Sequence, residues 1–349
     1  MITDLLNDLR DDAGLAQAIG QRPNRRVHAV LIASPWVGRS VWAVFAGRRP
    51  VPTVIVKVDA DPGSHPRLRR EHQALTALHR RTDLRGFVPP PVLLRSLGSR
   101  LVLVQGGLPG TPLTIRARTR LRGSVPQKEA EQQALLRWLH RLQSPATNEG
   151  FHIDADAVLR RLRRLAGNTA ATRHLEARLQ QTTDTWGGLT VPVVPCHGDL
   201  TAANILLHRG TVAVFDWEGG LDQRMALADL VVFLNSYARR QRTRDGWTMS
   251  REAGFRRAFG TRGWMGRLSA DTFRRHLDHL GLPRDAAEGL FVTTLVELAD
   301  GRIGGAHPGM SRTMWTAHLR SYTKLHATAT QGPMRRGCRR LTGVGNPPV

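Results

Sequence analysis

The sequence predicts a bilobal α+β protein: a small antiparallel β-sheet lobe with one helix, then a larger, mainly helical lobe. Two observations support this. Between residues 21 and 104, short apolar runs are separated by Gly/Pro turns, and one stretch has helical spacing. Beyond a Gly/Pro-rich connector at residues 106–112, apolar residues recur mainly at helical spacing. A length of 349 residues fits two domains. The expected divisions are an N-terminal helix at 1–20, a first lobe at 21–104, a second lobe at 105–330 and a mobile tail at 331–349.

The first lobe is predicted element by element from its pattern. β-Branched and apolar runs bounded by turn sequences indicate strands, and Leu68, Leu75 and Leu78 form one stripe of a helix. The expected elements are strands at 27–33, 41–46 and 54–58, a helix at 67–80, and strands at 87–94 and 100–104.

The second lobe is predicted in the same way. Helical spacing indicates helices at 127–142 and 155–181, and the chain beyond residue 219 is expected to be mainly helical to about residue 328. A short hairpin interrupts the helices, with strands at 205–208 and 212–215 and a turn at Arg209-Gly210.

Composition narrows the class of protein. The formal net charge is +23, and 48 of the 51 basic residues are arginines. A codon bias toward arginine explains such an excess, as would nucleic acid, an anionic membrane surface or an anionic substrate. Two cysteines exclude a disulfide framework, no CxxC pair exists for zinc, and no stretch is long and apolar enough to span a membrane. We therefore expect a cytoplasmic protein without a membrane partner.

The stretch from Cys196 to Glu218 carries the clearest chemistry. His197 and Asp199 are followed by Asn204, and Asp216 closes the apolar strand of the next hairpin. The hairpin should return the chain so that Asp216 lies close to Asn204, which supplies two oxygen ligands for a divalent cation beside Asp199. Phosphoryl transfer from ATP needs such a metal pair, a carboxylate that accepts the hydroxyl proton, and a lysine on the phosphates.

A lysine and a glutamate upstream match the same chemistry. A kinase-type site requires a lysine on the third strand and a glutamate on the following helix. Lys57 lies in the expected third strand and Glu71 in the expected helix. The chain has three lysines, so a lysine at this position indicates that a compact point charge is required. The alternatives are a solvent-facing Lys57 and a surface ion pair between Glu71 and Arg67.

These pieces together resemble the aminoglycoside phosphotransferase and choline kinase family, a branch of the protein-kinase-like fold. The resemblance covers about residues 27–235, and the His-Gly-Asp and Asp-Trp-Glu sequences point to its small-molecule branch. The matching motifs are VIVKV, REHQAL, LVLVQGGLPGTPL, ALLRWLHRL, CHGDLTAANILL, VFDWEGG and ALADLVVFL.

The resemblance implies a role for each matching residue. Asp199 would be the catalytic base, and His197 would brace the catalytic loop through hydrogen bonds. Lys57, paired with Glu71, would bind phosphate. Asn204 and Asp216 would bind Mg²⁺. Two further acidic residues also match. Asp229 would buttress the catalytic loop. For Glu218 two roles stay open: a contact to metal or substrate, and a structural role.

The nucleotide-binding loop departs from the glycine-rich pattern. Residues 34–40 lack GxGxxG, although backbone amides near Ser34 and Gly38 could cradle phosphate with help from Arg39. By the resemblance, residues 103–107, including Gln105 and Gly106, would form the hinge that meets adenine.

The expected cofactors are ATP and Mg²⁺, and the expected acceptor is a hydroxylated small molecule: a sugar, nucleoside, natural product or antibiotic. Residues 219–330 contain 17 Lys/Arg against 10 Asp/Glu, which favours a neutral or anionic acceptor, such as a sugar or nucleoside, over a polycationic aminoglycoside. Two other classes stay open. One is a catalytically inactive, nucleotide-binding scaffold. The other is an RNA-binding protein that uses its arginine runs, for which binding should depend steeply on salt.

Overall fold

The computed structural model describes residues 13–19, 27–34, 38–48, 50–115, 125–144, 150–241, 249–260, 263–301 and 312–327. The expected helix at 1–20 is present as α2 (Ala13–Ile19). Its first twelve residues and the expected tail at 331–349 lie outside the described residues. The division of the chain into two lobes at residues 104–105 stays a prediction.

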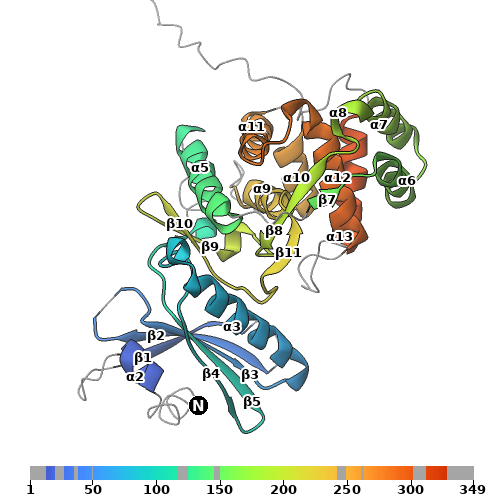
Figure 1. Ribbon diagram of the computed structural model, residues 1–349. Coiled ribbons are helices and arrows are strands. Elements are labelled where there is room, and N and C mark those ends of the chain that lie inside the picture. Colours follow the sequence, from blue (N-terminus) through green and yellow to red (C-terminus); the bar gives the residue numbers. More distant parts are fainter. Residues whose placement is uncertain are drawn as a thin grey trace, which may run out of the picture.

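The N-terminal part is a five-stranded antiparallel sheet with one long helix, as the sequence predicts. The strand order is β1-β2-β3-β5-β4, and α3 lies along the sheet (Figure 1). The elements are β1 (Val27–Ala33), β2 (Arg39–Ala46), β3 (Val54–Asp59), α3 (His65–Arg80), β4 (Pro91–Leu97) and β5 (Arg100–Gly106).

Hydrophobic alternation explains the two faces of this sheet. Val54 and Val56 of β3 and Val102 and Val104 of β5 are buried on one face, where they pack with Leu15 of α2. On the other face, Leu68 near the start of α3 packs with Leu101 and Leu103 of β5, whereas Leu75 and Leu78 of the predicted stripe belong to the larger core cluster. Packing on both faces of the sheet therefore holds the central strand β3 in place, and with it Lys57, which this strand carries.

The expected strand at 87–94 is wrong in its position. The observed strand β4 begins at Pro91, and Phe87 instead closes a turn by donating its backbone N–H to the carbonyl of Leu84. Pro89 and Pro90 have no N–H to donate within a ladder, and the pairing with β5 starts at Pro91, the last residue of the proline run, opposite Gln105.

The connector after β5 leads into the expected hairpin. β6 (Thr111–Pro112) pairs with β9 (Ile205–His208), which pairs with β10 (Thr211–Val214). Arg209 and Gly210 in the turn both have positive φ, +47° and +79°, as a tight hairpin turn requires. The hairpin predicted from the sequence is confirmed.

The rest of the chain is mainly helical, with a second small sheet of order β11-β8-β7. The strands are β7 (Gly150–His152), β8 (Thr190–Cys196) and β11 (Asp222–Met225). The helices are α5 (Val125–Leu142), α6 (Ala155–Ala166), α7 (Ala170–Gln180), α8 (Thr183–Trp186), α9 (Ala228–Arg240), α10 (Arg251–Phe259), α11 (Trp264–His279), α12 (Ala287–Asp300) and α13 (Arg312–Leu325).

The single helix expected at 155–181 is wrong, because two helices occupy this stretch. Gly167 ends α6 with φ of +87°, a conformation that favours glycine. Thr169 then caps α7, because its side chain accepts a hydrogen bond from the backbone N–H of Thr172.

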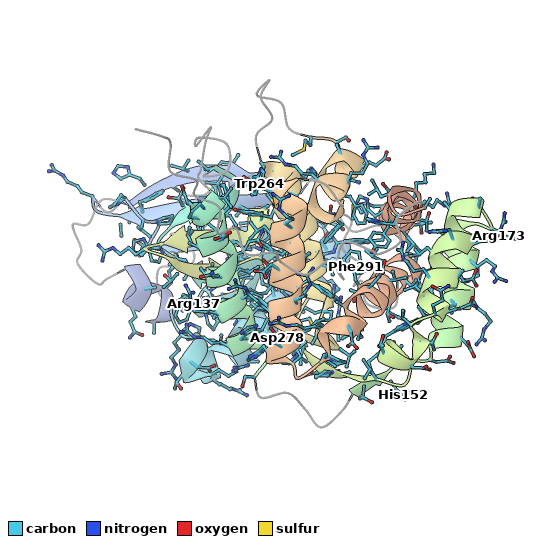
Figure 2. The ribbon with its side chains drawn as sticks, turned by 90° about the horizontal axis from the view of Figure 1, so that it is seen from above. Arg137, His152, Arg173, Trp264, Asp278 and Phe291 are labelled. Carbon is cyan, nitrogen blue, oxygen red and sulfur yellow. The ribbon has the colours of Figure 1, made fainter. Side chains whose placement is uncertain are left out.

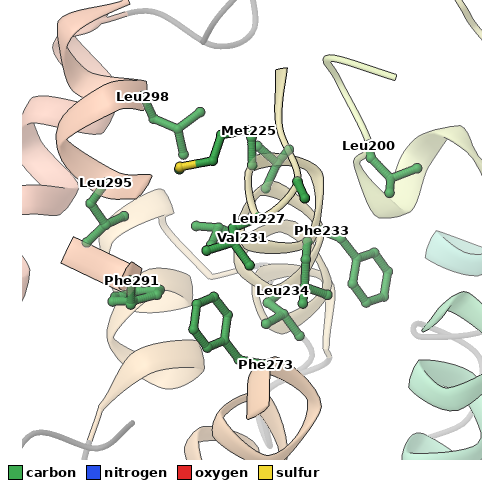
Figure 3. Close-up of a cluster of buried hydrophobic side chains, with 14 of the residues drawn as sticks. Leu200, Met225, Leu227, Val231, Phe233, Leu234, Phe273, Phe291, Leu295 and Leu298 are labelled. Carbon is green, nitrogen blue, oxygen red and sulfur yellow. The ribbon is translucent and has the colours of Figure 1, made fainter. Parts of the chain in front are cut away.

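Helix α9 lies at the centre of the helical region. Val231 and Leu234 are fully buried and lie beside Phe273 of α11 and Phe291 of α12 (Figure 3). Figure 2 shows Phe291 among the packed helices, whereas Arg173 of α7 points outward from their edge. This buried helix carries Asp229 in its first turn, next to the catalytic loop.

Candidate active site

Lys57 and Glu71 form the ion pair that the sequence predicts. Lys57 Nζ lies 2.9 Å and 2.7 Å from the two carboxylate oxygens of Glu71, and both side chains are buried. The sheet and α3 position them, since β3 carries the lysine and α3 packs its buried face toward the same sheet. The solvent-facing alternatives for Lys57 and Glu71 are therefore wrong.

Two acidic residues from the segment after β10 join this pair. Lys57 Nζ lies 2.5 Å from Asp216 Oδ1 and 3.3 Å from Glu218 Oε1. Asp216 has φ of +70°, a conformation that non-glycine residues seldom adopt outside turns and functional sites. Burial alone would lower the pKa of Lys57, but the carboxylates of Asp216 and Glu71 raise it above its ordinary value. Lys57 therefore stays charged.

Arg39 completes the cluster from the first position of β2. Its Nη1 donates to Glu218 Oε2 at 3.0 Å, and its Nη2 forms an ion pair with Glu218 Oε1. The pair is buried, and its partners are 179 positions apart in the chain. This contact joins the N-terminal sheet to the segment after β10.

The cluster can bind a hard cation. One carboxylate oxygen each from Glu71, Asp216 and Glu218 lie within 4.8 Å of one another, and Asp216 is 29% exposed at this point. Carboxylate oxygens are the ligands that Mg²⁺ prefers, and the ion needs few of them because water and phosphate complete its shell. Lys57 Nζ lies among these oxygens, so Asp216, the exposed carboxylate of the three, is the residue that fits a divalent cation. A role of Asp216 or Glu218 in binding metal stays a prediction.

The loop that begins at His197 and carries Asp199 follows β8 and is held by Asp229. The Asp229 carboxylate accepts hydrogen bonds from the backbone N–H groups of His197, at 2.6 Å, and Gly198, at 3.0 Å. Gly198 has φ of +79°, which lets the loop turn there. Burial raises the pKa of Asp229.

His197 links the same loop to the strand before Asp216. Its Nδ1 accepts from the backbone N–H of Asp199 at 3.2 Å, and its Nε2 lies 3.0 Å from the carbonyl oxygen of Phe215. These two contacts require the neutral ring with its proton on Nε2. Burial lowers the pKa of His197, which agrees with that neutral form. The geometry supports a bracing role.

Asp199 and Asn204 lie together on the other side of this loop. Asn204 Nδ2 donates to the Asp199 carbonyl at 3.0 Å and to Asp199 Oδ2 at 3.2 Å, so its Oδ1 is the atom that could bind a cation. The backbone N–H of Phe215 donates to the Asn204 carbonyl, which aligns the hairpin end with Asn204. Burial, together with the charge of Asp216, raises the pKa of Asp199 to about 7.

The nucleotide-loop and hinge residues are placed as follows. Ser34 Oγ donates to the Arg39 carbonyl at 3.1 Å, and Gly38 turns the chain with φ of +86°. Gln105 is buried at the end of β5, and among the described residues its Oε1 has no hydrogen-bond partner. The backbone N–H of Gly106 donates to the Pro90 carbonyl, so the amide of Gly106 is already used within the protein.

The structure thus places the predicted residues in two adjoining groups: Lys57 with Glu71 and Asp216, and Asp199 with Asn204 and His197. The sequence reasoning missed the bidentate contact between Arg39 and Glu218. The sequence placed Arg39 beside the expected phosphate-binding loop, but no signal in it indicated Glu218 as the partner of this arginine. The roles of these side chains in a reaction stay predictions.

The chain belongs to the phosphotransferase enzyme family, whose family model matches residues 28–267. The family resemblance inferred from the motifs is thereby confirmed. No curated protein is similar enough in sequence to count as a relative. None of the described helices has an apolar stretch long enough to cross a membrane.

Solved structures of phosphotransferases resemble the chain at low identity. The aminoglycoside phosphotransferase APH(3'')-Id from Streptomyces rimosus, in complex with ADP and streptomycin, is 16% identical, with a TM-score of 0.42 over 83% of this chain and 98% of that one. The GDP complex of wild-type aminoglycoside 2'-phosphotransferase-IIIa is 11% identical, with a TM-score of 0.47 over 90% of this chain and 97% of that one.

Proposed function

We propose that this phosphotransferase moves the γ-phosphoryl group of ATP to a hydroxyl group of a small molecule. The observation that carries the proposal is that Lys57 Nζ contacts the carboxylates of both Glu71 and Asp216, beside the loop that contains Asp199. In phosphoryl transfer the protein supplies positioning and charge, and a lysine held by a glutamate is suited to bind the α- and β-phosphates.

Asp199 is proposed as the base that accepts the proton of the acceptor hydroxyl. A base works best when its pKa lies near the working pH, and the pKa of Asp199 is raised to about 7 by burial and by the charge of Asp216. Asn204 orients the carboxylate by donating to Oδ2.

Asn204 and Asp216 are proposed to hold Mg²⁺. A bound Mg²⁺ ion would neutralise negative charge on the β- and γ-phosphates. Asp216 is 29% exposed, and Lys57 keeps its carboxylate ionised: burial alone would raise the pKa of Asp216, but Lys57 lowers it below its ordinary value.

The acceptor is proposed to be neutral or anionic. Beyond the segment after β10, basic residues outnumber acidic ones, 17 against 10 between residues 219 and 330. Arg224 of β11 lies over Gly198, next to Asp199, and its guanidinium forms an ion pair with Asp222, so the positive charge of this region comes from its excess of basic residues. A polycationic acceptor would be repelled by this charge.

The test is an ATP-consumption screen against sugars, nucleosides, amino alcohols and antibiotics. Asp199→Ala should nearly abolish transfer and leave MgATP binding largely intact. Asp216→Ala should lose both transfer and Mg²⁺-dependent nucleotide binding, and Lys57→Ala should fall between them. Each loss of turnover should be about 10²–10³-fold, as is usual when one electrostatic stabiliser is removed.

Two outcomes would contradict the proposal. If the wild-type protein binds MgATP but transfers phosphate to no acceptor, and Asp199→Ala changes nothing, the protein is a nucleotide-binding scaffold. If nucleic acid is bound with a steep salt dependence that survives the loss of Asp199, the RNA-binding alternative is favoured.

A further inference from the structure

Arg39 binds the carboxylate oxygens of Glu218 that a cation at Asp216 would need as ligands. Arg39 contacts both carboxylate oxygens of Glu218, and Lys57 contacts one of them. The side chains of Arg39 and Glu218 are 2% and 4% exposed. Glu218 therefore cannot turn an oxygen to a cation bound at Asp216 without giving up at least one of its contacts to Arg39.

The charges of the cluster set up a competition. Three carboxylates, those of Glu71, Asp216 and Glu218, face two positive groups, Lys57 and Arg39. Arg39 and a divalent cation both bind Glu218 through its oxygens, so each weakens the binding of the other when no nucleotide is present. When the guanidinium of Arg39 leaves Glu218, phosphate oxygens can replace the carboxylate, because a guanidinium binds both groups in the same bidentate manner.

Arg39 lies next to the loop where the nucleotide phosphates are expected to bind. It directly follows Gly38 and the loop whose amides are expected to cradle phosphate, and Ser34 Oγ bonds its carbonyl. Its guanidinium contacts Glu218, which also contacts Lys57.

We propose that Arg39 is a positioning residue that exchanges Glu218 for a phosphate oxygen of the nucleotide, which releases Glu218 to the divalent cation. This inference rests on the proposed function. It makes cation and nucleotide binding mutually reinforcing, because each ligand removes the obstacle to the other. A chain without a glycine-rich loop thereby gains a side chain that recognises phosphate.

The test measures binding, with Mn²⁺ as a spectroscopic substitute for Mg²⁺. Mn²⁺ affinity is measured by electron paramagnetic resonance without nucleotide, and ADP affinity by calorimetry with and without Mn²⁺. Arg39→Met should bind Mn²⁺ about 10-fold more tightly than wild type without nucleotide, which corresponds to about 1.4 kcal/mol. The same variant should bind ADP in the presence of Mn²⁺ about 10-fold more weakly.

Three further variants separate the exchange from simpler effects. Arg67→Met removes a positive charge near Arg39 and should leave Mn²⁺ affinity within about 2-fold of wild type. Glu218→Gln should weaken Mn²⁺ binding, and Arg39→Met in that background should no longer strengthen it. Arg39→Lys, the milder change, should lie between wild type and Arg39→Met in both measurements.

The outcomes distinguish the exchange from the proposed function. If wild type binds ADP with Mn²⁺ but Arg39→Met and Arg39→Lys leave Mn²⁺ binding unchanged or weaker, the exchange is wrong and the proposed function stands. An equal gain in Arg67→Met would also overturn it, since bulk charge would then be the cause. If wild type binds no ADP under any condition, the proposed function fails and the exchange fails with it.

Discussion

Replacing Asp229 tests how the catalytic loop is held. The side chain accepts two hydrogen bonds, from the backbone N–H groups of His197 and Gly198, and is almost fully buried. In Asp229→Ala both N–H groups lose their acceptor inside the protein, where water does not replace it. The loop that carries Asp199 then loses its contact with α9.

The magnitude follows from these two bonds. Leaving a buried N–H without an acceptor costs about 1–3 kcal/mol, so two of them cost about 2–6 kcal/mol. The carboxylate is itself desolvated, as the raised pKa of Asp229 indicates, and its removal returns part of that cost. We therefore expect the free energy of unfolding to fall by about 2–4 kcal/mol. Asp229→Asn should lose about half as much, because its amide oxygen still accepts one bond.

The assay is urea unfolding followed by circular dichroism, combined with hydrogen exchange at the amides of His197 and Gly198. Exchange at these two amides should accelerate more than at those of β3, which belongs to the N-terminal sheet. Asp278→Ala is a matched control, because Asp278 pairs with Arg284 at the surface and its loss should change stability by less than about 0.5 kcal/mol. An Asp229→Ala protein as stable as the control, with unchanged exchange, would refute this account of the loop.

Three further predictions concern stability and pH. Gly289→Ala should destabilise by about 1–3 kcal/mol in urea unfolding, because the added Cβ would lie 2.2 Å from the indole of buried Trp186 and the helix-propensity gain of about 1 kcal/mol is smaller than the clash. Burial lowers the pKa of His276 to about 3, so the unfolded state binds the proton more readily than the folded state. The contribution of His276 to the free energy of unfolding is therefore fully present above about pH 6.5 and falls toward pH 3, by at most about 1.4 kcal/mol per pH unit. His276→Gln should flatten that slope. If Asp199 is the base, kcat/KM should fall as pH drops through about 7, and a rate that stays constant down to pH 5 would contradict its role.

Local pattern was sufficient for most of the N-terminal sheet. The β-branched run around Lys57 and the stripe that begins at Leu68 predicted β3 and α3, because strand and helix bury residues at different periods. The scarcity of lysine singled out Lys57, and the ion pair with Glu71 followed from the expected order of strand and helix. Spacing alone likewise predicted the hairpin that ends before Asp216.

Local pattern failed where one residue overrides the average of its neighbours. Gly167 interrupts a stretch whose apolar residues continue at helical spacing, and Pro89 and Pro90 precede a strand that begins only at Pro91, although its apolar residues begin earlier. Hydrophobic periodicity reports which residues are buried, whereas the backbone of a single glycine or proline decides where the element ends.

Length, charge and most of the order of strands and helices were thus determined by the sequence itself. The sequence also supplied the residues that are proposed to carry phosphotransfer chemistry. The family resemblance implied that Asp229 would buttress the loop of Asp199, and the structure identified the amides of His197 and Gly198 as its partners. Only the tertiary structure decided that Arg39 contacts Glu218 across 179 positions. The physical reason is that secondary structure depends on neighbours along the chain. A contact between distant side chains depends instead on how whole elements pack, and with 48 arginines in the chain no local feature marks the one that packing brings to Glu218.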